Sequence, residues 1–266
     1  MENFSFAFVL AGFVVGVIVG LTGVGGGSLM TPLLIFGFGI KPALAVGTDL
    51  LFAAGTKFGG LLNFARQRII PWRVVFSLSL GSVPAAVVTL AVLHHFGTSN
   101  PTVQHAITFT LGIALLLTAA ATLYKAIRGP LRRQDNAENE ELAPADTTSH
   151  PWMPIVFGAA IGVLVTLTSV GAGAIGVTVL MLLYPQLPLP RIVAADIAYA
   201  VPLTLVAGLG HASLGTVDWS LLGMLLIGSL PGIWLGSHLV TRVPERFIRS
   251  ALSVLLAWAG TKLILI

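Results

Sequence analysis

An apolar segment broken by glycines occurs twice in this chain, and it limits the fold more than any other feature. The first copy is Leu21-Thr22-Gly23-Val24-Gly25-Gly26-Gly27, and the second is Leu167-Thr168-Ser169-Val170-Gly171-Ala172-Gly173. In lipid, the loosened backbone of a broken helix finds no water, so a break is tolerated only against protein or a polar cavity. Two breaks at matching places in two halves indicate a transporter whose binding site lies between the broken helices.

The composition excludes a soluble protein. Of the 266 residues, 56% are hydrophobic and 9% are charged, whereas a soluble domain carries about 25% charged residues. The net charge of +4 would favour nucleic acid in a soluble protein, but the basic residues here lie in short loops between apolar runs. This pattern sets orientation in a membrane, so the expected partner is the lipid bilayer and not nucleic acid. The absence of cysteine excludes disulfides, thiolate metal sites and a cysteine nucleophile.

The chain also repeats itself over a distance of 147 residues. Trp72 aligns with Trp219, and Gly-Ser-Val-Pro at 81–84 aligns with Gly-Ser-Leu-Pro at 228–231. The two glycine breaks align with a shift of 146. A duplication explains these matches. It divides the chain into a first membrane repeat at 1–128, a cytoplasmic linker at 129–151 and a second membrane repeat at 152–266.

Each repeat contains four apolar runs, most of them near the ~20 residues that span a bilayer as a helix. We therefore expect an all-α polytopic membrane protein. The first run of each repeat is too long for one helix and is broken in its middle. The runs are 4–37, 43–64, 73–96 and 103–125 in the first repeat, and 152–184, 191–211, 217–240 and 246–265 in the second.

The loop charges favour one of two topologies. If every run crosses the membrane once, the basic loop residues divide 8 to 5 between the two sides. If each broken run enters and leaves on the same side as a hairpin, they divide 11 to 2, with only Lys41 and Lys262 outside. The positive-inside tendency favours the second arrangement. We expect two inverted repeats, each a Gly-broken hairpin plus three transmembrane helices, with both termini outside; full spans are the alternative.

Four motifs stand in order along the chain. They are Gly25-Gly26-Gly27 followed by Pro32, Ala-Val-Gly-Thr-Asp at 45–49, Val-Asp-Trp at 217–219 and Gly-Ser-Leu-Pro at 228–231. Together they resemble the TauE/SafE family of membrane permeases, and the resemblance covers nearly the whole chain. It implies a multi-pass protein of the bacterial cytoplasmic membrane that transports small sulfur-containing anions, with sulfite export as the usual label.

The glycine breaks are the first candidates for a substrate site. Glycine lets backbone N–H groups face a ligand, and a helix that starts after a break offers free N–H donors and a partial positive charge to an anion. Neighbouring hydroxyls add donors. The alternative interpretation is close helix packing by small residues. The candidates are Thr22, Gly25, Gly26, Gly27 and Ser28 in the first repeat, and Thr168, Ser169, Gly171 and Gly173 in the second.

Ionisable residues inside the apolar runs are the second candidates. Asp49 and Asp196 are repeat equivalents near the starts of their predicted helices. An unpaired carboxylate in lipid costs about 3 kcal/mol, so each faces a cavity, pairs with a cation, binds a proton or caps its helix. Lys57 attracts the anion, pairs with one of these aspartates, or extends to the membrane surface. Tyr199, one turn beyond Asp196, can hydrogen-bond in the same cavity.

The histidines are less informative than the aspartates and Lys57. His211 ends a predicted helix, and proton handling is one interpretation of it. The other histidines suggest positions at the membrane interface, and no set of residues predicts a metal site or a cofactor.

We therefore expect a secondary transporter, because the chain has no phosphate-binding loop for ATP. At about 100 mV, moving one charge is worth ~2.3 kcal/mol, so expelling a monoanion from a negative cytoplasm needs no further coupling. Export of sulfite or an organosulfonate is the simpler prediction. Proton-coupled anion uptake and a passive channel are the alternatives. An intramembrane aspartyl enzyme is disfavoured, because Asp49 and Asp196 lack a Gly-x-Gly-Asp context. A homodimer is left open.

Overall fold

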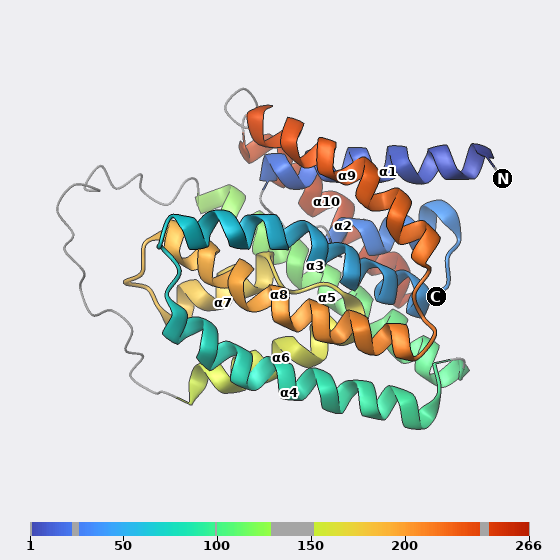
Figure 1. Cartoon of the computed structure of the whole chain (residues 1–266), viewed down its shortest axis with the longest axis horizontal. Helices are drawn as coiled ribbons and strands as arrows, with labels where there is room; N and C mark the ends of the chain where they lie inside the picture. The colour runs from blue at the N-terminus through green and yellow to red at the C-terminus, as the bar shows by residue number, and fades with distance from the viewer. Residues whose placement is uncertain (1, 23–26, 99, 129–151, 240–244, 266) are drawn as a thin grey trace.

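The computed structural model describes residues 2–22, 27–98, 100–128, 152–239 and 245–265, and within these it contains helices and no strand. The all-α prediction is confirmed. The elements are α1 (Glu2–Thr22), α2 (Gly27–Pro32), the π-helix η1 (Leu33–Gly37), α3 (Pro42–Arg66), α4 (Trp72–Phe96), α5 (Pro101–Arg128), α6 (Met153–Thr168), α7 (Ala174–Leu183), α8 (Leu189–Ser213), α9 (Trp219–Leu239) and α10 (Glu245–Ile264). Figure 1 shows their arrangement.

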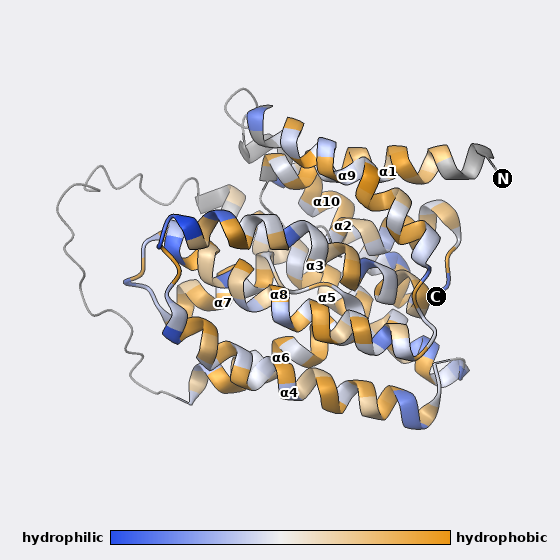
Figure 2. Cartoon of the chain, viewed as in Figure 1, coloured by the Kyte–Doolittle hydropathy of each residue, from blue (hydrophilic) through white to orange (hydrophobic). Residues whose placement is uncertain are grey.

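Four of these helices are long and apolar enough to cross a membrane, judged within the described residues. Their outward faces are apolar: Phe76 on α4 is 69% exposed and Ile227 on α9 is 67% exposed. Figure 2 shows hydrophobic residues along the helices and hydrophilic residues gathered mainly towards the ends. An apolar surface of this extent suits lipid and not water, so the chain is a multi-pass membrane protein. The four helices are α4, α5, α8 and α9.

Each broken run contains two separate helices: α1 and α2 lie on either side of residues 23–26, which are outside the described residues, and α6 and α7 lie on either side of the second break. In the first, the ring of Phe38, just after η1, lies 4.7 Å from the ring of Phe8 on α1, measured between centroids. The chain therefore folds back beside its own start, as a hairpin requires. In the second, Gly171 and Gly173 turn the chain between α6 and α7 with φ angles of +127° and +145°. L side chains rarely adopt these angles, so this turn needs glycine.

Two pairs of helices from different repeats pack in parallel through glycine. An added Cβ at Gly12 or Gly16 of α1 would lie 2.4 or 2.5 Å from a backbone oxygen of α9. The equivalent glycines of α6 approach α4 in the same way, at 2.4 and 2.3 Å. Small residues at such crossings let helices pack closely in lipid. The contacts are Gly12 with Leu225, Gly16 with Ser229, Gly158 with Leu78 and Gly162 with Ser82.

The centre of the molecule is formed by α3 and α8, which occupy equivalent places 147 residues apart in the chain. Gly47 at the start of α3 packs against His211 at the end of α8, and Gly60 packs against Ile197 near its start. The two helices therefore run antiparallel. Two equivalent helices related in this way have opposite directions in a membrane, which is the packing an inverted repeat requires. The inversion itself stays a prediction.

Candidate functional site

The second break lies against the start of α2. A Cβ on Gly27 would stand 2.1 Å from the carbonyl oxygen of Ser169, so the two backbones can approach this closely only because residue 27 is glycine. Ser28, beside it, is buried. The broken segments of the two repeats therefore meet. Gly25, Gly26 and the side chain of Thr22, which the sequence also proposed for the site, lie outside the described residues.

The second break is held by its own side chains. Ser169 follows the last residue of α6 in a left-handed conformation, with φ of +58°. The Thr168 hydroxyl donates to the Leu164 carbonyl oxygen (2.6 Å) and accepts from the Val170 N–H (3.1 Å). It therefore stabilises the turn. At the far side of the turn, α7 begins after Gly173 without a side-chain cap, so its first N–H groups carry the partial positive charge of a helix start.

Lys57 reaches this turn from the middle of α3. Its side chain is only 9% exposed, and Nζ donates to the carbonyl oxygen of Ala172 at 2.7 Å. The side chain therefore points into the protein and does not extend to a surface. Its ammonium also interacts electrostatically with Asp196 and, more weakly, with Asp49. Since an ammonium has three donor hydrogens, Lys57 can bind a further acceptor beside Ala172.

Asp49 lies next to the same turn. It is fully buried, and its carboxylate accepts a hydrogen bond from the Thr31 hydroxyl on α2. The Ser169 hydroxyl of the second break lies beside this carboxylate, but neither it nor Asp49 Oδ1 has a hydrogen-bond partner within the described residues. The helix starts at Pro42, so Asp49 lies about two turns inside it and does not cap it. The capping alternative is therefore wrong for Asp49, and a residue from each repeat contacts its carboxylate.

Asp196 and Tyr199 occupy the corresponding place on α8, and both are buried. They face Gly176 on α7: a Cβ there would lie 2.1 Å from Asp196 Oδ1 and 2.5 Å from the Tyr199 hydroxyl oxygen. The hydroxyl and the carboxylate therefore lie beside each other against Gly176. Asp196 lies about two turns after the start of α8 at Leu189, so it does not cap the helix either.

Three contributors to this cluster were missed from the sequence. Thr31 had a usable signal, because Thr178 stands 147 residues later as its repeat equivalent. The carbonyl of Ala172 carried no signal, since every residue has one. Gly176 had none either, because its equivalent is Leu29. In the second repeat, Thr178 donates to the Ala174 carbonyl oxygen on its own helix, so the two halves of the site differ.

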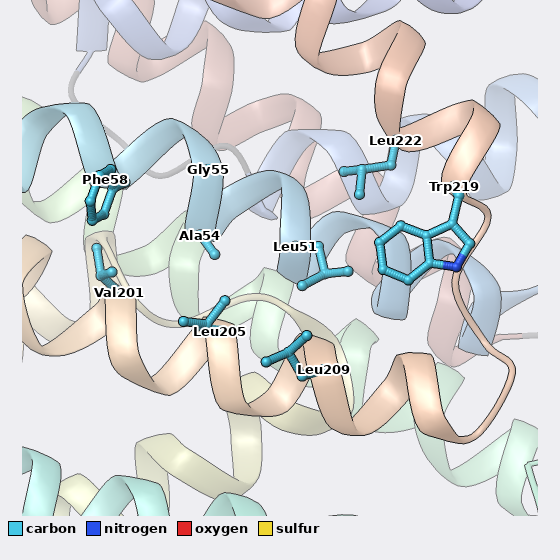
Figure 3. A pocket seen from close by; sticks show the side chains of 9 residues that line it. All are labelled: Leu51, Ala54, Gly55, Phe58, Val201, Leu205, Leu209, Trp219 and Leu222. Atoms are coloured by element: carbon cyan, nitrogen blue, oxygen red, sulfur yellow. The ribbon is translucent and has the colours of Figure 1, made fainter.

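A separate apolar groove lies between α3, α8 and α9, with a volume of about 350 Å³. Figure 3 shows its lining, which includes Phe58, Leu205, Leu209 and Trp219. These four side chains are between 44% and 62% exposed, so they face the lipid. The groove has no charged side chain and its only polar side-chain group is the Trp219 indole N–H, so it does not suit an anion. The described residues also contain no group of three or more His, Asp or Glu side chains arranged to hold a metal ion.

Comparison with known proteins gives a consistent family assignment. A family model described as sulfite exporter TauE/SafE matches residues 8–263. The probable membrane transporter protein YjnA of Bacillus subtilis (strain 168) is 36% identical over 260 residues, which are 98% of this chain and 100% of the relative. YunE and YdhB of the same strain, both also called probable membrane transporter proteins, are 26% and 25% identical; the alignments cover 87% and 96% of this chain and 85% and 98% of the relatives. No solved structure matches.

Proposed function

The chain belongs to the sulfite exporter TauE/SafE family, and on that premise we propose that it is a secondary transporter that exports a small sulfur-containing anion, such as sulfite or an organosulfonate. The family and the names of the relatives make it a membrane transporter. The substrate, the direction of transport and the cytoplasmic membrane as its location are parts of the proposal.

One observation carries the anion site. The buried ammonium of Lys57 binds the Ala172 carbonyl in the turn that leads into the start of α7. The turn between α6 and α7 therefore has a buried cation bound to it and leads directly into a helix start. Both favour an anion, and the low polarity of the surroundings strengthens the attraction.

The proposed substrate lies beside the second break. Its oxygens accept hydrogen bonds from the remaining donors of Lys57 and from the Ser169 hydroxyl, beside the partial positive charge at the start of α7. Gly27 closes the site from the first repeat, because its backbone contacts Ser169. Motion of one repeat against the other would then open the site to either side in turn, as in other transporters with paired broken helices.

The membrane potential supports export. A potential of about 100 mV, negative inside, favours the outward movement of a monoanion by ~2.3 kcal/mol. No hydrolysis of a nucleotide is needed for that step.

Proton-coupled uptake is the second candidate, and the two aspartates favour it. If Asp49, Lys57 and Asp196 are all ionised, this buried cluster carries a net charge of −1. A bound monoanion would change the net charge of the cluster to −2, and gathering this charge in a site of low polarity is costly. A proton on one carboxylate would offset that cost and would travel with the anion.

The proposed topology has both termini outside. Figure 1 shows the two termini at one end of the molecule and the α3–α4 connection at the other. Lys262 lies at the end that holds the termini, with Nζ 5.1 Å from the centre of the Phe36 ring. Arg66, Arg68 and Arg73 flank the α3–α4 connection. The positive-inside tendency then supports a cytoplasmic position for that connection.

Purified protein in liposomes tests the proposal. Binding and transport of sulfite, sulfonates and thiosulfate are measured for the wild type and for Lys57→Met, which keeps the length of the side chain but removes its charge. Loss of a charged hydrogen bond, worth about 1.5–3 kcal/mol, lowers affinity roughly 10- to 100-fold.

Lys262→Met is the matched control, because this lysine lies at the exposed end of α10 against aromatic rings. It should bind as the wild type does. Equal affinity in Lys57→Met and the wild type would remove Lys57 from the site. A failure of all three anion classes to bind would overturn the proposed substrate class.

A further inference from the structure

His211, in the last turn of α8, is fully buried and has no part in the anion site described above. Its ring connects three parts of the molecule. Nε2 lies 2.9 Å from the Thr166 carbonyl oxygen on α6, and Nδ1 lies 2.9 Å from the Thr216 hydroxyl oxygen in the segment before α9. Gly47 of α3 packs on its other side, where a Cβ would stand 3.0 Å from the His211 Cβ.

The partners of the ring fix where one hydrogen must lie. A carbonyl oxygen only accepts hydrogen bonds, so Nε2 carries a hydrogen and donates it to Thr166. A neutral imidazole has a single N–H, so the neutral form of His211 must leave Nδ1 bare as an acceptor.

The Thr216 hydroxyl can hydrogen-bond to Nδ1 whether the His211 ring is neutral or protonated. The hydroxyl oxygen lies 2.9 Å from Nδ1 and also 2.9 Å from the His211 carbonyl oxygen. When the ring is neutral, the hydroxyl donates to Nδ1. When the ring is protonated, the hydroxyl accepts from Nδ1–H and donates its own hydrogen to the His211 carbonyl oxygen. That carbonyl already accepts the Thr216 N–H at 3.0 Å, so it is satisfied in both states.

We propose that His211 is a reversible proton-binding site, in which rotation of the Thr216 hydroxyl keeps every hydrogen bond of the ring in both states, and that its proton controls how firmly the second break is held. A buried polar group left without a partner is costly, and here neither state leaves one. The ligand of this site is a proton.

Helix ends favour the protonated ring. Thr166 contributes one of the last carbonyls of α6, and His211 itself lies in the last turn of α8. Both helix ends carry partial negative charge, which stabilises a cation. Burial disfavours the cation, and these two ends together with two hydrogen bonds from a charged ring oppose part of that cost.

No ionisable side chain of the described residues hydrogen-bonds to the ring. Neither α6 nor α7 contains an ionisable residue. Asp218, before α9, is engaged elsewhere: its carboxylate accepts the Leu221 N–H at 3.0 Å, and its own N–H bonds to Thr48. The other ionisable residues on the elements around His211 are Asp49, Lys57 and Arg66 on α3, Arg73, His94 and His95 on α4, and Arg191, Asp196 and Tyr199 on α8.

The proton acts on the anion site through α6. Thr166 lies three residues before Ser169, which lies beside Asp49 and contacts Gly27. A hydrogen bond from a charged donor is roughly twice as strong as one from a neutral donor. Protonation of His211 therefore ties the end of α6 more firmly to α8. This part of the inference rests on the proposed function.

The proton site is tested by nitrogen NMR of histidine-labelled protein in lipid nanodiscs, from pH 9 to pH 4. His211→Gln identifies the signal of His211. At high pH the ring should be neutral with its hydrogen on Nε2, and at low pH both nitrogens should carry hydrogen. A ring that stays neutral over the whole range, or a neutral ring with its hydrogen on Nδ1, would overturn the proposal.

Two variants of Thr216 make the test specific. Thr216→Val keeps the shape of the side chain but removes the hydroxyl, and should lower proton affinity about tenfold, which moves the midpoint down by roughly one pH unit. Thr216→Ser keeps the hydroxyl and should titrate as the wild type does. If Thr216→Val does not fold, the titration of the wild type alone decides. A midpoint that is the same in Thr216→Val and the wild type contradicts the role of the hydroxyl.

Transport measured against pH in liposomes separates this inference from the proposed function. The pH profile of anion transport should move down in Thr216→Val by the same amount as the NMR midpoint. A titrating ring with no transport of any tested anion overturns the function and leaves the proton site standing. Transport with a non-titrating ring overturns the proton site. A titrating ring with an unshifted transport profile overturns the link to the break.

Discussion

At the scale of single residues, the site depends on what each buried polar group contacts. Asp49 and Asp196 are repeat equivalents, yet Asp49 accepts from Thr31 while Asp196 faces Tyr199 and Gly176. Lys57 has Thr204 as its equivalent, and the Thr204 hydroxyl donates to the Ala200 carbonyl oxygen on its own helix. The single cation of this cluster therefore makes its two halves unequal.

Gly176→Ala tests the second half of the cluster. The new methyl group would lie 2.1 Å from Asp196 Oδ1, so α7 or the carboxylate must move. Overpacking of this kind costs about 1–3 kcal/mol, and we expect anion transport to fall at least tenfold, measured in liposomes with equal amounts of protein. Gly59→Ala on α3 is the matched control, because a Cβ there meets no atom within 4 Å. Wild-type transport by Gly176→Ala would show that the position of Asp196 is unimportant.

At the scale of elements, the parallel pairs hold the two repeats together. Gly81 on α4 and Gly228 on α9 are repeat equivalents that complete these contacts from the other side. A Cβ on Gly81 would lie 1.9 Å from the Ile155 carbonyl oxygen of α6, and a Cβ on Gly228 would lie 2.0 Å from the Val9 carbonyl oxygen of α1. Since backbone cannot yield as a side chain does, a methyl group at either position separates a helix pair.

Gly81→Ala and Gly228→Ala should therefore lower the unfolding temperature by similar amounts. A cost of about 1–3 kcal/mol corresponds to several degrees in a chain of this size. Gly223→Ala, also on α9 but with open space around it, should leave the unfolding temperature unchanged. Thermal unfolding in detergent, followed by circular dichroism, gives the comparison. A large loss at one of the two equivalent positions alone would contradict equivalent packing of the two pairs.

At the scale of the whole molecule, the arrangement of the helices decides which loops share a side of the membrane. The fold-back of the first broken run returns the chain to the end from which it started. This places the connections of the first repeat on alternate sides in the way the hairpin topology requires. The antiparallel packing of α3 and α8 is what an inverted second repeat requires, and the inversion itself remains a prediction.

The topology can be tested cleanly because the chain has no cysteine. Gln67→Cys, between α3 and α4, and Asn100→Cys, just before α5, are both exposed positions. In intact cells, a maleimide that cannot cross the membrane should label Asn100→Cys and not Gln67→Cys. Both should react once the cells are opened. Labelling of Gln67→Cys alone in intact cells would reverse the proposed orientation, and labelling of both would show that α4 does not separate the two positions across the membrane.

The sequence by itself determined the class of the protein and its internal duplication. Apolar runs of spanning length require helices in lipid, because each backbone group must find its partner within the helix. The breaks were visible because several glycines follow one another closely in the middle of such runs, and each glycine lowers helix propensity. Lys57, Asp49 and Asp196 stood out for the same reason, since charge is costly inside an apolar run.

Only the tertiary structure decided which of these residues meet, and how. The contact of Gly27 with Ser169 and the bond from Lys57 to Ala172 join positions more than 100 residues apart, and no local pattern encodes such a pairing. The contributions of the Ala172 carbonyl, Gly176 and Thr166 come from backbone groups or from the absence of a side chain. Their roles depend on the approach of neighbouring helices in space, which spacing along the chain does not specify.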